Sequence, residues 1–159
     1  MMLLSKTSQY AIQALVYLAA QQSETPVLNR NIAQYLKVPS AYLAKIMQDL
    51  ARSGLLYSYR GRLGGFCLRE GAEHTDLATI LSLTEGPRFT DECIFGLKVC
   101  SDETACPLHA RWTPIKEQII AMLHEQTLAS LANALKTGKY RIADLPGALW
   151  SAAITTSVS

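Results

Sequence analysis

Residues 30–69 of this chain read RNIAQYLKVPSAYLAKIMQDLARSGLLYSYRGRLGGFCLR. Apolar residues recur at helical spacing on both sides of Val38-Pro39-Ser40, which predicts two short helices joined by a tight turn. We expect Asn29 to cap the first helix and Ser40 to cap the second. Two helices joined in this way form a helix-turn-helix pattern, which helical hairpins that do not bind DNA also share.

The second half of the segment predicts a β-hairpin. Leu55–Tyr59 and Phe66–Arg69 have strand character and flank the glycine-rich turn Arg60–Gly65. A hairpin directly after the second helix is the wing of a winged helix, although a glycine-rich hairpin with solubilising charges has the same composition. The expected fold class is therefore mainly α with a small β-hairpin. It comprises a winged helix-turn-helix domain and a long C-terminal dimerisation helix.

This fold suggests where the chain would contact DNA. The first turns of the second helix reach base edges in the major groove, and arginines on an open wing tip can enter the minor groove. The expected DNA-binding residues on these two elements are Ser40, Tyr42, Lys45, Arg60, Arg62 and Gly64.

The charge of the chain is distributed unevenly around a net value of +2. Residues 1–70 hold eight Lys and Arg against three acids, and residues 71–159 hold seven against ten. A basic N-terminal half indicates a polyanionic partner, although a solvated basic face has the same composition. His74 and His124 lie in helical or capping contexts without a paired-carboxylate constellation, and no nucleophile with its base is recognisable, so the sequence does not indicate an enzyme.

Further helices are expected on either side of this motif. Ser8 or Thr7 can cap a first helix, Thr75 or Asp76 a helix that ends at Gly86, and Thr127 a helix that Gly138 stops. An amphipathic stretch follows Leu108, and we expect its regular helix to begin near Thr113, because Pro114 is tolerated only in a first turn.

These features divide the chain into four expected parts. They are a DNA-binding domain in residues 1–86, a metal- or cluster-binding loop in 87–107, dimerisation helices in 108–137 and a flexible tail in 138–159. No apolar run is long enough to span a bilayer and no secretory signal is recognisable, so we expect a cytoplasmic protein without a membrane partner.

The stretch DECIFGLKVCSDETACPLH, residues 91–109, gathers Cys93, Cys100, Cys106 and His109. Soft sulfur ligands select zinc, copper or iron–sulfur clusters, and three Cys with one His also make a tetrahedral zinc set. Unrelated buried thiols are the alternative, which the polarity of the loop disfavours. Cys67 lies between two packing residues of an expected strand, and we leave it outside the metal site.

Over about residues 4–135 the chain resembles the Rrf2-type winged-helix transcription regulators. The similarity is carried by SQYAIQALVYLA, by VPSAYLAKIMQDLARSGLLYSYRGRLGGF, by ILSLTEGP, by the triple-cysteine loop and by CPLHARW followed by TLASLA. The resemblance implies a homodimer that exchanges domains through the long helix, with an iron–sulfur cluster held by the three loop cysteines.

The resemblance also implies a fourth ligand. IscR-like members use a histidine just after the last cysteine, and this chain has His109 at that position. NsrR-like members use an aspartate from the first helix of the partner subunit, and this chain has Gln9 at that position. This difference favours a 2Fe–2S cluster over a 4Fe–4S cluster. The first gap of six residues, against five in IscR-like proteins, leaves the cluster type open, and Asp91 or Glu92 could also serve as ligands.

The expected function is that of a homodimeric regulator that binds a palindromic operator in double-stranded DNA. The cluster would modulate this binding in response to redox state, nitric oxide or iron. The alternative is a zinc-stabilised or cluster-free winged-helix repressor. An electron carrier would have no use for arginines on a wing.

Overall fold

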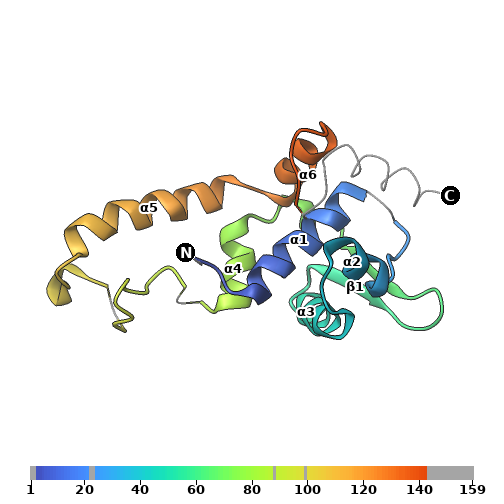
Figure 1. Cartoon of the computed structure of the whole chain (residues 1–159), viewed down its shortest axis with the longest axis horizontal. Coiled ribbons are helices and arrows are strands. Elements are labelled where there is room, and N and C mark those ends of the chain that lie inside the picture. Colours follow the sequence, from blue (N-terminus) through green and yellow to red (C-terminus); the bar gives the residue numbers. More distant parts are fainter. Residues whose placement is uncertain (1–2, 22–23, 88, 99, 143–159) are drawn as a thin grey trace.

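The computed structural model describes residues 3–21, 24–87, 89–98 and 100–142. The elements follow in the order α1 (Lys6–Gln21), α2 (Asn29–Leu36), α3 (Ser40–Arg52), β1 (Leu56–Tyr59), β2 (Gly65–Leu68), a 3-10 turn (Ala72–His74), α4 (Leu77–Glu85), a second 3-10 turn (Asp102–Thr104), α5 (His109–Glu125) and α6 (Leu128–Lys136). The predicted fold class is confirmed, with helices dominating and one small hairpin (Figure 1). None of the helices among these residues is long and apolar enough to cross a bilayer.

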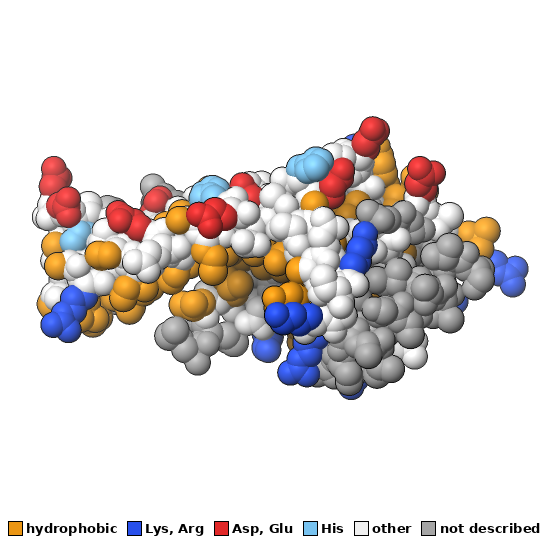
Figure 2. Space-filling model, turned by 90° about the horizontal axis from the view of Figure 1, so that it is seen from above, with side chains coloured by type: hydrophobic (Ala, Val, Ile, Leu, Met, Phe, Trp, Pro, Cys, Tyr) orange, Lys and Arg blue, Asp and Glu red, His pale blue; other side chains and the backbone are white. Residues whose placement is uncertain are grey.

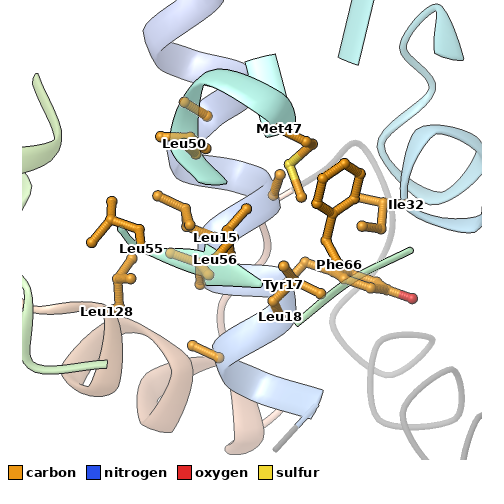
Figure 3. Close-up of a cluster of buried hydrophobic side chains, with 14 of the residues drawn as sticks. Leu15, Tyr17, Leu18, Ile32, Met47, Leu50, Leu55, Leu56, Phe66 and Leu128 are labelled. Carbon is orange, nitrogen blue, oxygen red and sulfur yellow. The ribbon is translucent and has the colours of Figure 1, made fainter. Parts of the chain in front are cut away.

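Helix α1 is the centre of the fold because it packs against α2, α3, α4, α6 and β2. Its segment Ala14–Ala20 is apolar on every side of the helix, and accordingly all of these residues are buried. Side chains from α3, the hairpin and α6 complete one cluster around it (Figure 3). The members labelled there include Leu15, Leu56, Phe66 and Leu128.

The wing is an antiparallel hairpin in which Leu56 pairs with Leu68 and Tyr59 with Gly65. Val27 extends it on the other side of β2, exchanging backbone hydrogen bonds of 2.8 and 2.9 Å with Phe66. Gly65 has a φ of 138°, and a Cβ there would lie 2.2 Å from the carbonyl oxygen of Val27. Glycine is therefore required where the α1–α2 connection meets the wing.

The starts of α2 and α3 differ from the prediction. Leu28 and Pro39 occupy the N-cap positions, and neither makes a side-chain cap bond, so Asn29 and Ser40 are the first helical residues and not caps. The side-chain amide of Asn29 instead donates to the carbonyl oxygen and to the hydroxyl of Ser40, both at 2.9 Å. The polar residues that suggested two caps join the two helices to each other.

Of the remaining helix starts, the cap of α1 differs from the prediction, and the caps of α4 and α6 agree with it. The backbone N–H of Ser8 donates to Ser5 Oγ at 3.1 Å, so Ser5 caps α1, two or three residues before the predicted caps Thr7 and Ser8. Asp76 caps α4 by accepting from Thr79 N at 2.7 Å, and Thr127 caps α6 through a reciprocal pair with Ser130, as predicted.

Helix α5 begins at His109, so the predicted start near Thr113 is wrong. Pro114 lies inside the helix, where it removes one backbone hydrogen bond without ending the helix. The helix projects from the body of the protein as an arm, with the cysteine loop returning along it to α4 (Figure 1). At the base of the arm, Leu123 packs against Ala78 and Leu81 of α4.

Helix α6 turns back from the arm and joins the main core. Leu128, Ala132 and Leu135 are buried in the cluster around α1, and Ile142 packs against the same cluster. The division of the chain into four parts stays a prediction, but α6 adds to the core that the N-terminal helices form. Of the predicted tail, residues 143–159 lie outside the described residues.

Candidate functional site

The loop between α4 and α5 brings the four predicted ligands together. The Sγ atoms of Cys93 and Cys106 lie 3.6 Å apart, and Cys100 Sγ lies 3.4 Å from His109 Nδ1. All of these cysteines are free thiols. His109 is placed by the first turn of α5, and a hydrogen bond of 2.9 Å from its backbone N–H to the carbonyl oxygen of Cys106 closes the loop onto the helix.

The imidazole of His109 has partners on both nitrogens. Its Nε2 lies 2.9 Å from Asp102 Oδ1 and 3.4 Å from Thr113 Oγ1, while Nδ1 faces Cys100. A carboxylate that accepts from one ring nitrogen leaves the lone pair of the other nitrogen free to bind a metal. Among the described residues, the carboxylate hydrogen-bonded to His109 is that of Asp102. Asp91 and Glu92 remain predictions as alternative ligands.

Cys93 is the most enclosed of the three loop thiols, with 6% of its surface exposed. The backbone N–H of Phe95 lowers the pKa of Cys93 below its ordinary value, against the effect of burial, and the thiols of Cys106 and Cys100 lower it further. A lower pKa favours the thiolate, which is the metal-binding form.

The donors fit an iron–sulfur cluster in chemical type, because such clusters are held by thiolates with an occasional imidazole. Within the described residues, no three His, Cys, Asp or Glu side chains are placed to hold a single metal ion. The indole N–H of Trp112, one turn along α5 from His109, is buried and has no acceptor within the described part of the chain. Trp112 and Cys93 line the same groove, so an acceptor at the loop would satisfy this N–H.

Cys67 lies apart from these ligands, in β2 on the wing. Burial raises the pKa of its thiol, with a smaller opposite effect from Tyr59, so its environment favours the neutral form. Gln9 also has other partners, since its amide donates to the carbonyl oxygen of Leu4 at 3.1 Å.

The first turns of α3 present Ser40, Tyr42 and Lys45 to solvent. Ser40 and Lys45 have exposed side chains, while Tyr42 is 38% exposed and packs edge-on against Tyr10 with ring centres 5.9 Å apart. The hydroxyl of Tyr42 lies 2.6 Å from Thr7 Oγ1, which fixes the start of α3 against the start of α1.

The wing tip exposes Arg60 and Arg62, and neither forms an ion pair with another described residue. Gly64 is buried beneath them, and a Cβ at this position would lie 2.4 Å from the carbonyl oxygen of Tyr59. Its N–H donates to the carbonyl oxygen of Gly61 at 3.1 Å. Gly64 therefore shapes the turn that carries the two arginines.

Three side-chain contacts at the loop and the wing were not predicted from the sequence. They are the Asp102–His109 pair, a hydrogen bond of 3.3 Å from Gln48 of α3 to Ser58 of β1, and the guanidinium of Arg69 above the ring of Tyr57 at 4.5 Å. The signal for the first pair in the sequence was an acidic residue in the loop shortly before His109. The Gln48–Ser58 bond depends on how α3 packs against the wing, and the Arg69–Tyr57 contact depends on the register of the two paired strands.

A winged helix with a thiol-rich loop and a projecting helix defines a class of DNA-binding transcription regulator. The Rrf2 family model, described as an iron-dependent transcriptional regulator, matches residues 4–134, and the chain belongs to this family.

Similar proteins agree with this assignment. An HTH-type transcriptional regulator of Aquifex aeolicus is 31% identical over 134 residues, covering 83% of this chain and 92% of the relative. The regulator IscR of Serratia proteamaculans is 27% identical over 132 residues, covering 83% and 80%. These relatives regulate transcription and are not enzymes, as the sequence indicated.

Solved structures show the same fold. CymR, the global cysteine regulator of B. subtilis, superposes with a TM-score of 0.68 at 25% identity, covering 84% of this chain and 98% of CymR. IscR of T. potens superposes with a TM-score of 0.66 at 25% identity, covering 87% of this chain and 91% of that protein.

Proposed function

We propose that this transcription regulator is a homodimer whose operator binding is modulated by an iron–sulfur cluster held by Cys93, Cys100, Cys106 and His109. The observation that carries the proposal is that these side chains meet at one end of the arm, with Cys93 Sγ 3.6 Å from Cys106 Sγ and Cys100 Sγ 3.4 Å from His109 Nδ1. The relatives named IscR and the iron-dependent description of the family support the same cofactor.

The arrangement supports a cluster over a single zinc ion. Three thiols and an imidazole suit both in chemical type, but a tetrahedral zinc site needs all its donors directed at one centre. The donors do not converge on one such centre among the described residues, whereas a 2Fe–2S cluster takes two donors on each of its two iron atoms. Of the two nuclearities, 2Fe–2S is the one we propose, because His109 occupies the place of a fourth ligand.

Loop residues would transmit the state of the cluster to DNA binding. When bound, the cluster supplies bonds that hold the loop thiols at fixed separations. Residues 86–92 connect the end of α4 to Cys93, and the carbonyl oxygen of Cys106 accepts a hydrogen bond from the first residue of α5, so the loop joins the DNA-binding domain to the start of α5. Ordering of such a segment is a common switching device.

The arm would form the dimer interface. Leu108, Ile115 and Met122 are spaced by seven residues along α5 and are 40%, 51% and 52% exposed. Figure 2 shows hydrophobic side chains along one side of the arm and Asp and Glu along the other. An exposed apolar stripe of this length needs a cover, and a second copy would place two winged helices for the half-sites of a palindromic operator. We propose that a regulator of this kind acts in the cytoplasm.

The cofactor is tested by anaerobic purification, visible absorption, and iron and sulfide analysis. The expected protein is coloured and contains both elements, whereas a zinc protein is colourless. Cys106→Ala should lose the cluster, and the matched variant Cys67→Ala should keep it because Cys67 lies on the wing. Full occupancy in Cys106→Ala would remove the proposed ligand set.

Regulation is tested by titrating cluster-loaded and cluster-free protein against the same panel of DNA fragments at one salt concentration. Coupling energies of about 1–3 kcal/mol change affinity by about 5- to 150-fold. We expect a difference of at least about fivefold for some fragments. Identical curves across the panel would reduce the metal to a structural role.

A further inference from the structure

A pocket of about 350 Å³ lies between α1 and the turn that joins α2 to α3, away from the cysteine loop. Three cations line it, namely Lys6, Lys37 and Arg141. The remaining lining is Gln9, Tyr10, Gln13, Leu36, Val38 and Ile142, so no Asp or Glu contributes. None of the three cations has a carboxylate partner within the described residues.

Each cation comes from a different part of the chain. Lys6 is the first residue of α1, where the partial positive charge of the helix N-terminus adds to its own. Lys37 follows α2 in the left-handed conformation, with φ 56° and ψ 45°, and this places its side chain at the helix-turn-helix turn. Arg141 comes from the segment after α6.

The segment after α6 runs back along α1 to reach this pocket. Lys136, at the end of α6, lines a separate pocket with Leu18 and Ala19 of α1, whereas Arg141 lines the present one with Gln9 and Gln13. Ile142 packs against the core cluster and holds the segment there. A basic side chain far from residues 1–86 in the sequence is thus added to the DNA-binding domain.

The pocket adjoins the start of the recognition helix. Tyr10 lines it and packs edge-on against Tyr42, and Lys37 precedes Ser40 by three residues. The N-terminal turns of a recognition helix enter the major groove, and the phosphates at the edge of that groove pass beside them. Cations in this position are within reach of those phosphates when the helix lies in the groove.

We infer that Lys6, Lys37 and Arg141 bind a phosphate of the DNA backbone beside the recognition helix, so that the segment after α6 is part of the DNA interface. This inference rests on DNA binding by the winged helix. A phosphate contact adds affinity independent of sequence and increases the salt dependence of binding. Lys6 Nζ also donates to Gln9 Oε1 at 3.4 Å, and the amide of Gln13, which lines the pocket, offers a neutral donor to the same oxygens.

The test is fluorescence anisotropy with a labelled duplex that the full chain selects from a random library, across a series of salt concentrations. Arg141→Gln should bind about five- to tenfold more weakly at 0.1 M salt and should lower the slope of log affinity against log salt by about 0.9. Lys37→Gln should behave in the same way, and Arg141→Lys should restore most of the slope.

Lys139→Gln is the matched control, because it removes the same charge from the same segment but Lys139 does not line the pocket. Lys139 lies over the ring of Tyr140 at 5.5 Å. Equal slopes for wild type, Arg141→Gln and Lys139→Gln would overturn the inference and leave DNA binding intact. Failure of the wild type to bind any duplex would instead count against the regulator function itself.

A second arm separates the two sources of phosphate. Wild type and Arg141→Gln are titrated with pyrophosphate by calorimetry. Micromolar binding that Arg141→Gln loses, together with an unchanged DNA slope, would assign the pocket to a free anion and overturn the DNA assignment. Weak or absent pyrophosphate binding, together with the reduced DNA slope, is the expected pair of results.

Discussion

Asp102 Oδ1 lies 2.9 Å from His109 Nε2, on the side of the imidazole ring opposite Cys100. Because the carboxylate holds the ring by one nitrogen, the other nitrogen is directed at the loop thiols. Carboxylate–histidine–metal chains of this kind fix the orientation of the ring and raise its basicity as a ligand. Asp102 is itself fully exposed, so the pair forms at the edge of the site.

Asp102→Ala is expected to weaken cluster retention without removing any ligand. Loss of such an outer partner costs about 10- to 100-fold in metal affinity. The measurement is the rate at which visible absorption decays in the presence of a chelator. Glu103→Ala is the control, because Glu103 is the adjacent exposed acid and has no described bond to His109. Equal decay rates for the two variants would rule out an orienting role for Asp102.

Arg62→Ala should reduce the salt dependence of DNA binding. The arginine is exposed at the wing tip with no ion pair to another described residue, so its guanidinium is available to the backbone or to the minor groove. Losing one phosphate contact lowers the slope of log affinity against log salt by about one unit. Lys139→Gln is again the charge control, and an unchanged slope for Arg62→Ala would mean that the wing does not touch DNA.

Much of the fold could be predicted because its signals are local. The apolar spacing of the helix-turn-helix, the glycine-rich turn of the wing and the caps at Asp76 and Thr127 all depend on residues close in sequence. The predicted starts of α2 and α5 were wrong, for two different reasons. Asn29 uses its side chain on the next helix, and α5 continues through Pro114 where the sequence indicated a boundary.

The ligands of the candidate site were also predictable, since three cysteines and a histidine stand within one loop. Their partners were not. Asp102 was one of four acids in that loop, and only folding decides which of them reaches His109. Arg141 falls in a segment that composition marked as a tail, and its place beside Lys6 depends on the packing of α6 against α1.

Met122→Glu is expected to shift the proposed dimer toward monomer. Met122 is 52% exposed on the α5 stripe, and a carboxylate there would be buried in the dimer interface without a partner. The measurement is light scattering after size-exclusion chromatography at several concentrations. Ala121→Glu adds the same charge at a neighbouring exposed position of α5 that is outside the stripe and should remain dimeric. A dimer of unchanged stability in Met122→Glu would place the interface elsewhere.

Gly64→Ala should destabilise the protein and weaken DNA binding together. The added Cβ meets backbone atoms, with the carbonyl oxygen of Tyr59 at 2.4 Å, so the turn beneath Arg60 and Arg62 must move. Overpacking of this kind costs about 1–3 kcal/mol of unfolding free energy, measured by urea denaturation. Gly61→Ala is the control for backbone strain in the same turn, because a Cβ at Gly61 meets nothing within 4 Å although its positive φ of 95° is one that residues with side chains rarely adopt. Equal losses in the two variants would contradict the steric argument.

Asp76→Ala is expected to cost about 1 kcal/mol of unfolding free energy at neutral pH, as for other N-caps. Asp76 caps α4 and also lies 3.4 Å from His124 of α5, so it stabilises the base of the arm. Burial raises the pKa of this carboxyl, but hydrogen bonds from Thr79 and the contact with His124 outweigh it, and the net pKa is lowered.

A carboxyl whose pKa is lower in the folded than in the unfolded state stabilises the protein above its unfolded pKa, and this contribution is lost as the pH falls through the folded pKa. The difference between wild type and Asp76→Ala in urea denaturation should therefore be full at pH 7 and shrink below about pH 4. Asp91→Ala, which removes an exposed acid of the cysteine loop, is the control. A difference between wild type and Asp76→Ala that stayed constant with pH would show that the ionised carboxylate does not act as the cap.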